Sequence, residues 1–341
     1  GVGFRLFDLA GVEAPRTHYV QFRIIENVRE FGATQYDGDF QGLYLVVEQP
    51  DGRFLKTHDL PECNIFKMEN NTGVQGIGGE LKYQGGPELP ANSSDLIRFK
   101  RTYESRTQPE SWWRANLDLE RYYAYRTIVD GIHHYDIANG KNYYYFHNGE
   151  NGLWQVHPWD LDLTWADNMF GTGNEPFLSR VLGIPNLDRD NQNRARELLN
   201  LLFNTDQAMR LIEEQMSFVY TRGQTSLVDA DRMMWDYNPI LTSGFVNSSK
   251  AGHGRYYESA VSPGGFEGMA RKMRSYVEQR SSWIDRNRLD FPVPVTPSVS
   301  YDGAEGYPVT GLSFRSTAFS ANGMAPQSIK WRIGEVYDPM N

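Results

Sequence analysis

The sequence predicts an α+β fold in which an N-terminal antiparallel sheet is followed by a helical lobe and a partial β module. Strand-like runs recur through residues 17–83, and helical periodicity dominates residues 118–132 and most of 195–288. Between these regions, the aromatic-rich residues 143–157 have the pattern of a single β-hairpin. Strands that come first and helices that follow are typical of α+β domains.

The composition is that of an ordinary globular protein of 341 residues, with 40% hydrophobic and 23% charged residues. Its net charge of −9 argues against a general nucleic-acid binder, which needs a basic surface. No apolar run is long enough to span a membrane. The single cysteine, Cys63, excludes an internal disulfide and any metal site built from several cysteines.

Four strands are expected before the first long helix. They comprise residues 17–25, 42–49, 64–69 and 80–83. Two of these strands carry a charge that could face a cleft. Glu48 ends the second strand and is either functional or a solvated strand end. Lys67 lies among apolar neighbours and either meets a phosphate or marks an edge strand.

Helical periodicity and turn residues place the other elements. The expected helices are residues 4–11, a helix starting near residue 94, and residues 118–132, 195–203, 209–219, 224–239 and 264–288; residues 54–56 form a short helix or a loop. The glycine-rich residues 72–79 lack a G-x-G-x-x-G pattern and no clear helix follows, so we expect a flexible loop there. Polar loops are also expected at residues 167–174 and 243–256.

The hairpin organises the polar residues of greatest interest. Its strands are residues 143–146 and 153–157, joined by an Asn- and Gly-rich turn. Asp136 precedes the hairpin, Asn142 opens it, and Asp160 and Asp162 follow it. Because the chain leaves and returns at the same end, Asp136, Asn142 and Asp160 are expected to converge. Carboxylate and amide oxygens suit a hard cation such as Mg²⁺.

Each of these hairpin residues, taken singly, also has an ordinary structural interpretation. An Asp beside a turn is usually a cap or an Asx-turn, and a Trp near a hairpin is usually core. Together, however, D-x₅-N, a hairpin and W-D-x-D form a much less common arrangement, and this combination favours a functional site.

The end of the sequence changes character. Residues 291–299 read as a stiff Pro-rich linker that separates a domain of residues 1–290 from residues 300–341, the start of a β-rich accessory module. Strands are expected there at residues 307–310, 312–314 and 329–336, the first at an edge because it contains Pro308. The sequence opens at Gly1 directly into a helical pattern, so we expect it to be part of a longer protein.

The ordered series of motifs resembles the CotH kinase family, named for spore coat protein H, over roughly residues 1–290. The motifs are residues 42–44 (GLY), 48–49 (EQ), 54–55 (FL), 64–68 (NIFKM) and 80–82 (ELK), then Asp136, residues 142–144 (NYY) and residues 158–162 (PWDLD). The resemblance implies an atypical protein-kinase-like two-lobe fold and transfer of phosphate from ATP to protein Ser/Thr hydroxyls.

The resemblance also implies roles for the hairpin residues. Asp136 matches the catalytic-loop aspartate that acts as base, and Asn142 and Asp160 match metal ligands, with Asp162 beside them. Asn142 lies six positions after Asp136, whereas the ordinary kinase motif has five. Trp154 matches an aromatic that packs against adenine, although a core tryptophan is an alternative.

The front of the domain departs from the family pattern. Family members carry further strands before the position of Gly1, with basic residues that could contact ATP phosphates. Lys67 and Lys82 therefore remain as candidates for phosphate contacts, and Glu48 for the nucleotide side of the cleft. The implied cofactors are ATP with Mg²⁺ or Mn²⁺.

Three functions compete at this point. The first is a secreted or cell-surface kinase with an unknown protein substrate; the second is a non-catalytic structural or adhesive module that associates with surface or appendage proteins. The third is a glycoside hydrolase, but Asp160 and Asp162 share one face of an extended chain and are too close to flank a sugar. Sequons at Asn70, Asn92 and Asn247 would permit glycosylation in a secretory setting.

Overall fold

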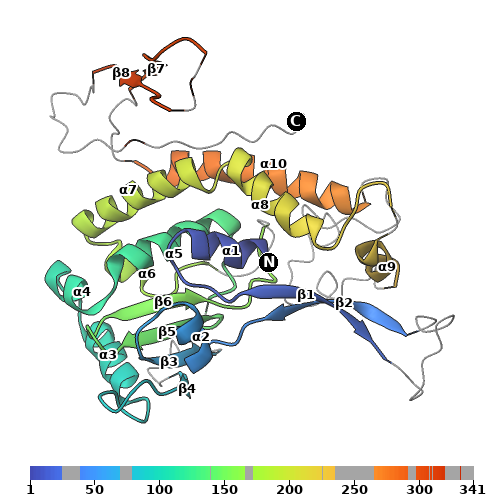
Figure 1. The fold of residues 1–341 in the computed structure, drawn as a ribbon. Coiled ribbons are helices and arrows are strands. Elements are labelled where there is room, and N and C mark those ends of the chain that lie inside the picture. Colours follow the sequence, from blue (N-terminus) through green and yellow to red (C-terminus); the bar gives the residue numbers. More distant parts are fainter. Residues whose placement is uncertain are drawn as a thin grey trace. The chain divides into compact units, whose positions relative to one another are not determined.

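The computed structural model describes residues 1–24, 39–69, 79–138, 140–165, 172–224, 226–234, 265–290, 297–306, 308, 310–318 and 331. The chain divides into two compact units, Gly1–Leu289 and Asp290–Asn341. The first unit combines helices with antiparallel sheets (Figure 1), so the predicted α+β class is confirmed. None of the described helices has the length and apolar character needed to cross a bilayer.

A four-stranded sheet with the order β4-β3-β5-β6 forms the centre of the first unit. Its strands are β3 (Cys63–Met68), β4 (Glu80–Tyr83), β5 (Tyr143–Asn148) and β6 (Trp154–Pro158). All neighbours are antiparallel, and β5 and β6 form the predicted hairpin, with Tyr143 opposite Pro158 at its open end.

Both faces of this sheet are buried at β3 and β5, because their side chains alternate between two hydrophobic cores, whereas the edge strand β4 is partly exposed. Tyr143 and Tyr145 of β5 belong to the main core beneath the helices. Tyr144 and Phe146 belong to a smaller core that includes Phe54. Phe54 lies in the short helix α2 (Gly52–Thr57), which begins where the Asp51 side chain accepts hydrogen bonds from backbone N–H groups.

A separate two-stranded ribbon consists of β1 (Thr17–Arg23) and β2 (Phe40–Val47). The register runs from Thr17 opposite Val47 to Arg23 opposite Phe40. Figure 1 shows the ribbon extending away from the larger sheet. One face of the ribbon, with Tyr19 and Leu45, turns towards the helices.

The remaining helices are α1 (Val2–Leu9), α3 (Ser94–Ser105), α4 (Glu110–Asn116), α5 (Leu119–Ile132), α6 (Leu178–Val181), α7 (Pro185–Leu201), α8 (Thr205–Ser217), α9 (Leu227–Met234) and α10 (Gly265–Arg288). Helix α7 begins ten residues before the expected start, with Pro185 in its first turn, a position that proline favours. Helices α4 and α6 are short and were not expected from periodicity.

Helix α5 is the central helix and delivers the chain to the hairpin. It lies between the four-stranded sheet and helices α7 and α10 (Figure 1) and is buried on nearly all sides. The helix ends at His133, which adopts a left-handed conformation with φ of 57°. This conformation turns the chain sharply into the loop that carries Asp136.

The second unit pairs β7 (Val299–Tyr301) with β8 (Phe314–Ser316), with Ser300 opposite Arg315. The expected strand at 312–314 is therefore displaced towards Ser316, and its partner precedes the expected 307–310 strand. Pro308 lacks the N–H that a ladder needs, which favours pairing through Val299–Tyr301 instead. The expected 329–336 strand, the 243–256 loop and most of the 72–79 loop lie outside the described residues.

Candidate functional site

A cavity of about 440 Å³ lies between α1, the β1–β2 ribbon, the segment after β6, and α10. We call it the site cavity. Its walls are Gly1, Val2, Gly3, Phe4, Tyr19, Leu45, Val47, Trp159, Asp160, Leu161, Asp162, Thr164, Trp165, Met269 and Met273. The walls are mainly apolar, and the carboxylates among them belong to Asp160 and Asp162. Such a cavity with a few polar groups is typical of a small-molecule site.

Asp160 and Asp162 follow the second hairpin strand directly. Asp160 has a φ of 54°, a left-handed conformation that bends the chain away from the sheet as β6 ends. Desolvation raises the pKa of Asp162, and the neighbouring carboxylates of Asp160 and Asp136 raise it further. The three carboxylates therefore form one electrostatic group, as expected from the hairpin.

Asn142 connects Asp136 to this segment. Its Nδ2 donates hydrogen bonds to the carbonyl oxygen of Asp136 at 2.8 Å and to Asp136 Oδ2 at 3.1 Å. Its own carbonyl accepts a hydrogen bond of 3.2 Å from the backbone N–H of Trp159. A φ of 62° at Asn142 makes this double contact possible. Asn142 thus contacts both Asp136 and Trp159, the residue that precedes Asp160.

His134 also contacts this loop. Its Nε2 lies 3.3 Å from the carbonyl oxygen of Asn142. Complete burial lowers the pKa of His134 to about 4, so the imidazole is neutral at pH 7. His134 therefore acts as a buried hydrogen-bonding group rather than as a charged one.

The carboxylates and the amide of this site suit a hard cation, because such ions bind oxygen ligands. Burial is the main cause of the raised pKa of Asp162, and repulsion from the carboxylates of Asp160 and Asp136 adds to it; a bound cation would relieve that repulsion. Asp160 and Asp162 offer two carboxylates, and waters or phosphates can complete the shell. Within the part of the chain that the structure describes, no group of three or more His, Cys, Asp or Glu side chains is arranged to hold a metal ion by itself.

A sequence profile of the CotH kinase protein family matches residues 2–284. The chain belongs to this family. Inner spore coat protein H of Bacillus subtilis (strain 168) is 26% identical over 200 residues, which are 54% of this chain and 55% of that protein. The chain therefore spans about half the length of that curated relative. The resemblance expected from the motifs is confirmed.

Trp154 of this CotH domain lies in the main hydrophobic core, with 3% of its surface exposed. Its ring stacks on Phe99 at 4.7 Å and on His147 at 4.3 Å between centroids. The residue does not line the site cavity. This placement corrects the expectation that Trp154 packs against adenine, because the sheet face that carries Trp154 is covered by helix α3.

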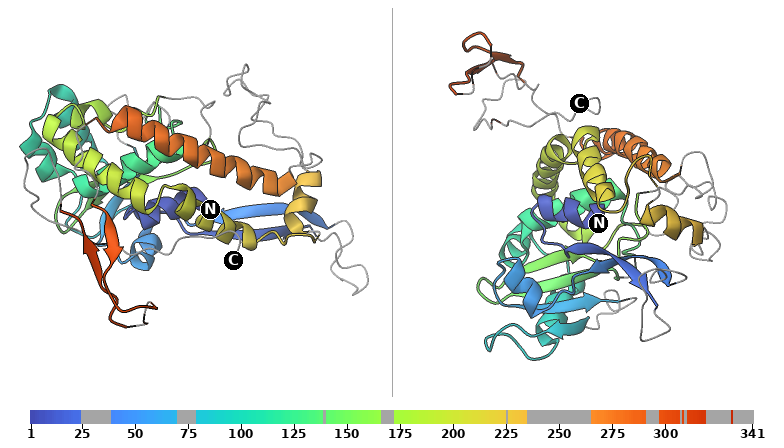
Figure 2. Two further views of the ribbon diagram at one scale, coloured as in Figure 1. Left: turned by 90° about the horizontal axis from the view of Figure 1, so that it is seen from above. Right: turned by 45° about the vertical axis from the view of Figure 1, so that its right-hand side comes forward.

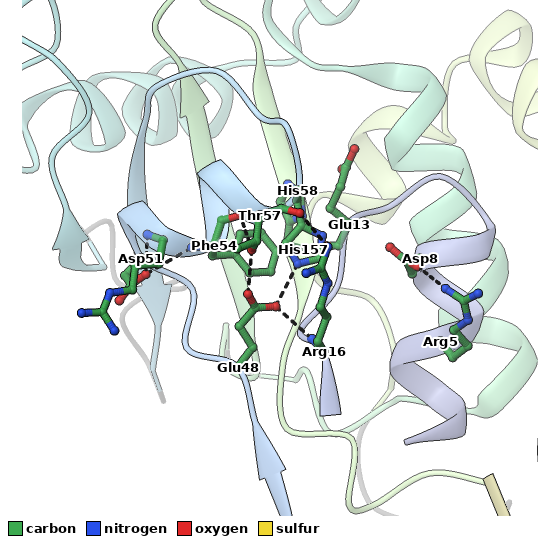
Figure 3. Close-up of polar contacts among 11 residues, drawn as sticks. Arg5, Asp8, Glu13, Arg16, Glu48, Asp51, Phe54, Thr57, His58 and His157 are labelled. Atoms are coloured by element: carbon green, nitrogen blue, oxygen red, sulfur yellow. Dashed lines mark hydrogen bonds and ion pairs between the residues drawn. The ribbon is translucent and has the colours of Figure 1, made fainter. Parts of the chain in front are cut away.

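Glu48 lies at the base of the ribbon beside Arg16, Thr57 and His58 (Figure 3) and is not among the residues that line the site cavity. Its carboxylate accepts hydrogen bonds from the Arg16 backbone at 3.0 Å and from Thr57 Oγ1 at 2.8 Å, and His58 Nε2 lies 2.9 Å away. Partial burial by itself raises the pKa of Glu48, but hydrogen bonds from His58, Arg16 and Thr57 lower it below its usual value. Glu48 thus fastens the ribbon to α2.

Lys67 and Lys82 lie on the β3–β4 side of the sheet and do not line the cavity. Lys67 Nζ is 3.4 Å from Glu69 Oε1, and Lys82 Nζ is 2.5 Å from Glu80 Oε2. Both lysines therefore have carboxylate partners on their own strands or just beyond. Their contact with phosphate stays a prediction.

The CotH domain also contains site residues that sequence reasoning missed. Trp159 and Trp165 flank the two carboxylates and line the cavity, and Met269 and Met273 of α10 close it. Lys141 forms an ion pair with Asp136. The tryptophans had a local signal, since they adjoin the W-D-x-D motif, but the methionines come from a distant helix with no such signal.

Proposed function

We propose that this chain is a kinase-like phosphotransferase that transfers the terminal phosphate of ATP to Ser/Thr hydroxyls of a protein, with Mg²⁺ or Mn²⁺. The observation that carries the proposal is the grouping of Asp136, Asp160 and Asp162 at the open end of one hairpin beside an apolar cavity. Phosphoryl transfer depends mainly on positioning and charge neutralisation, which such a group suits. Membership of the CotH kinase protein family supports the same reading.

The proposal includes a kinase-like arrangement of two lobes. The β1–β2 ribbon would belong to the nucleotide-covering lobe, and the helices around α5 would belong to the other. The site cavity lies between the ribbon and α10. Its tryptophan and methionine walls suit a planar, weakly polar base, because aromatic rings stack on nucleobases.

In this reaction Asp136 is the base. The acceptor hydroxyl oxygen bonds to the γ-phosphorus, the bond from that phosphorus to the β–γ bridging oxygen breaks, and ADP leaves. The hydroxyl proton passes to the Asp136 carboxylate. Asn142 and Lys141 hold this carboxylate in place, at 3.1 Å and 2.8 Å.

Asp160, Asp162 and Asn142 are the residues that would hold the metal ion. When bound, Mg²⁺ supplies positive charge that offsets the phosphate oxygens and the leaving group. The protein's contribution is to place the two carboxylates at the end of a rigid hairpin. Burial of both sheet faces fixes that hairpin.

Ligand-induced stabilisation tests this proposal without a known acceptor. The unfolding temperature of the chain is measured with ATP, with metal, and with both, and adenosine serves as the control. A ligand at a hundred times its dissociation constant adds about 2.7 kcal/mol of stability. Metal-dependent stabilisation by ATP is expected. If neither Mg²⁺ nor Mn²⁺ supports stabilisation by ATP, the phosphotransferase proposal is wrong.

A second candidate is a non-catalytic structural module in a surface or coat layer. The outer face of the ribbon favours it, because Val20, Phe22, Tyr44 and Val46 are all substantially exposed there. The relative named Inner spore coat protein H fits a coat-associated or surface location. A chain that assembles with coat material but binds no ATP would support this candidate over the first.

A further inference from the structure

Another cavity, of about 330 Å³, lies between α5, the segment of α6 and α7, and the C-terminal end of α10. We call it the second cavity. None of its lining residues lines the site cavity, and none belongs to the proposed phosphoryl-transfer site. Its volume is near the lower end of the range for small-molecule sites, which is about 300–1,000 Å³. A ligand can therefore bind here independently of the site cavity.

Charged side chains of both signs line the second cavity. They are Arg126, Arg288, Asp130 and Asp188, so their formal charges balance. Asp130 Oδ1 lies 3.9 Å from Nη2 of Arg126 and 3.9 Å from Nη2 of Arg288. These distances exceed that of a hydrogen bond. The two guanidinium groups are therefore close to Asp130 without a direct hydrogen bond to it.

Asp130 and Arg288 are the accessible members of this group, with side chains that are 16% and 44% exposed. Asp130 Oδ1 accepts a hydrogen bond from Tyr135 Oη at 2.9 Å, whereas Asp130 Oδ2 has no hydrogen-bond partner among the described residues. Arg288 also contacts Tyr135, but a guanidinium group has several N–H donors. Both side chains thus keep capacity for a ligand.

The wall also contains two buried atoms without hydrogen-bond partners in the described part of the chain, Arg126 Nε and Asn191 Oδ1. The Nη atoms of Arg126 donate to the carbonyl oxygens of Glu175 and Gly173, at 2.9 and 2.8 Å. Buried polar atoms are usually paired. One donor and one acceptor without partners favour a ligand that both accepts and donates hydrogen bonds.

A zwitterion fits such a wall better than a simple anion or cation. An anion would meet the aspartates and a cation would meet the arginines, whereas a zwitterion presents both signs to a wall of balanced charge. A carboxylate forms a bidentate pair with a guanidinium group, and an ammonium group donates to a carboxylate. The apolar lining residues Leu178, Leu182 and Ile284 suit an aliphatic group. An α-amino acid with an aliphatic side chain combines these parts.

We propose that the second cavity binds a free α-amino acid with an aliphatic side chain, whose carboxylate contacts Arg288 and whose ammonium group contacts Asp130. The inference concerns binding alone and goes beyond the proposed phosphotransferase function. The ordinary alternative is a solvent-filled gap beside loose ion pairs, a type of contact that contributes little to stability.

The test measures calorimetric binding of alanine, valine and leucine to the whole chain without nucleotide. Two analogues of leucine, each without one charged group, serve as ligand controls: isocaproate lacks the ammonium group, and isoamylamine lacks the carboxylate. Leucine should bind as one molecule per chain. Each analogue should bind about 10- to 100-fold more weakly, the range for a lost hydrogen bond to a charged group.

Variants then locate the bound amino acid. Arg288→Gln removes the guanidinium group and should weaken leucine binding about 10- to 100-fold, and Arg288→Lys should recover part of the loss. Asp130→Asn removes the charge that meets the ammonium group but keeps an acceptor for Tyr135, so it should weaken leucine binding with little change in unfolding temperature. Arg286→Gln is the control, because Arg286 is exposed on the same helix and donates to the Ser282 carbonyl.

The outcomes decide the inference independently of ATP binding. If none of the three amino acids binds, the second cavity is not an amino-acid site. Equal binding of leucine and both analogues would show that the cavity accepts any aliphatic group, and equal effects of Arg288→Gln and Arg286→Gln would place the bound amino acid elsewhere; either result overturns the inference. If amino acids bind but neither Mg²⁺ nor Mn²⁺ supports ATP binding, the inference stands and the phosphotransferase proposal fails.

Discussion

Arg280 of α10 donates a hydrogen bond from Nε to the carbonyl oxygen of Asp130 at 2.6 Å, in the last turn of α5. Its Nη2 donates to Tyr135 Oη at 3.0 Å, and Tyr135 in turn donates to Asp130 Oδ1 at 2.9 Å. The last carbonyls of a helix have no partner within it. Arg280 therefore supplies a donor to a carbonyl at the end of α5 and fixes Tyr135, the residue that precedes Asp136.

The same face of α10 reaches the site cavity. Met269, Met273, Tyr276 and Arg280 are spaced by four, three and four residues, which places them along one side of the helix. The two methionines line the cavity, and Tyr276 Oη donates to the Gly131 carbonyl at 3.1 Å. Figure 2 shows α10 as the long helix that runs beside α7 and α8. One helix thus joins a cavity wall to the loop of Asp136.

We expect Arg280→Met to lower the free energy of unfolding by about 1–3 kcal/mol, because the partly buried carbonyl of Asp130 loses its Arg280 donor and Tyr135 loses one of its hydrogen bonds. Turnover should fall more than ATP affinity, since the loop that carries the proposed base loosens while the cavity keeps its walls. Denaturant unfolding and steady-state kinetics measure the two effects. Arg286→Met is the control, because Arg286 is exposed and donates a hydrogen bond to the Ser282 carbonyl of its own helix. Equal effects of both variants would contradict this account.

Trp154 and Trp159 should respond in opposite ways to truncation. Trp154→Ala removes a large ring from the core and should cost about 3–5 kcal/mol of stability. Trp159→Ala opens a cavity wall instead, so it should weaken ATP binding roughly 10- to 100-fold with a smaller loss of stability. Denaturant unfolding and calorimetry on both variants make the comparison. A specific loss of nucleotide binding in Trp154→Ala would restore the expectation that the sequence suggested.

Glu48→Gln should show a stability effect that depends on pH. The folded-state pKa of Glu48 lies below its ordinary value of 4.5, so the ionised carboxylate stabilises the folded state. This stabilisation, about 1 kcal/mol for a partly exposed group, is present above the ordinary value and is lost as pH falls through the lowered pKa. The difference between wild type and variant should therefore shrink as the pH falls below 4.5.

Unfolding curves across this pH range give that difference directly. Glu150→Gln is a suitable control, because Glu150 is exposed in the hairpin turn. A difference for Glu48→Gln that grows as the pH falls below 4.5 would mean that the carboxylate destabilises the fold. Such a result would rule out the fastening role of Glu48.

The hairpin and its carboxylates could be predicted because their signals are local. A turn rich in Asn and Gly joins two short strands, and a hairpin returns the chain to its starting end whatever packs around it. The convergence of Asp136, Asn142 and Asp160 follows from that geometry. The D-x₅-N and W-D-x-D motifs on either side of the hairpin therefore carried most of the information about the site.

Trp154 and the cavity walls could not be predicted in this way, because they depend on packing. Every residue of β6 is buried, so alternation along this strand does not distinguish a core face from a ligand face. Glu48 reads as a free strand end until α2 folds back and brings Thr57 and His58 to it. Met273 meets the segment of Asp160 only because α10 packs across α5.

The last prediction separates the roles of Asp160 and Asp136. Asp160→Asn removes a charge that would face the metal, so metal-dependent ATP binding and turnover should both collapse. Asp136→Asn removes the proposed base, which should lower the rate by about 10²–10⁴ while ATP binding stays nearly intact. Calorimetry with Mg²⁺ and ATP, together with single-turnover transfer, measures both variants.

A measurement without nucleotide makes the same distinction. The charge of Asp160 raises the pKa of Asp162, so the two carboxylates repel each other in the metal-free protein. Asp160→Asn should therefore be at least as stable as the wild type without metal, and it should lose the stabilisation that Mg²⁺ gives to the wild type. Destabilisation of Asp160→Asn without metal would mean that Asp160 is a structural residue. Equal loss of ATP binding in both variants would show that Asp160 and Asp136 do not have separate roles as metal ligand and base.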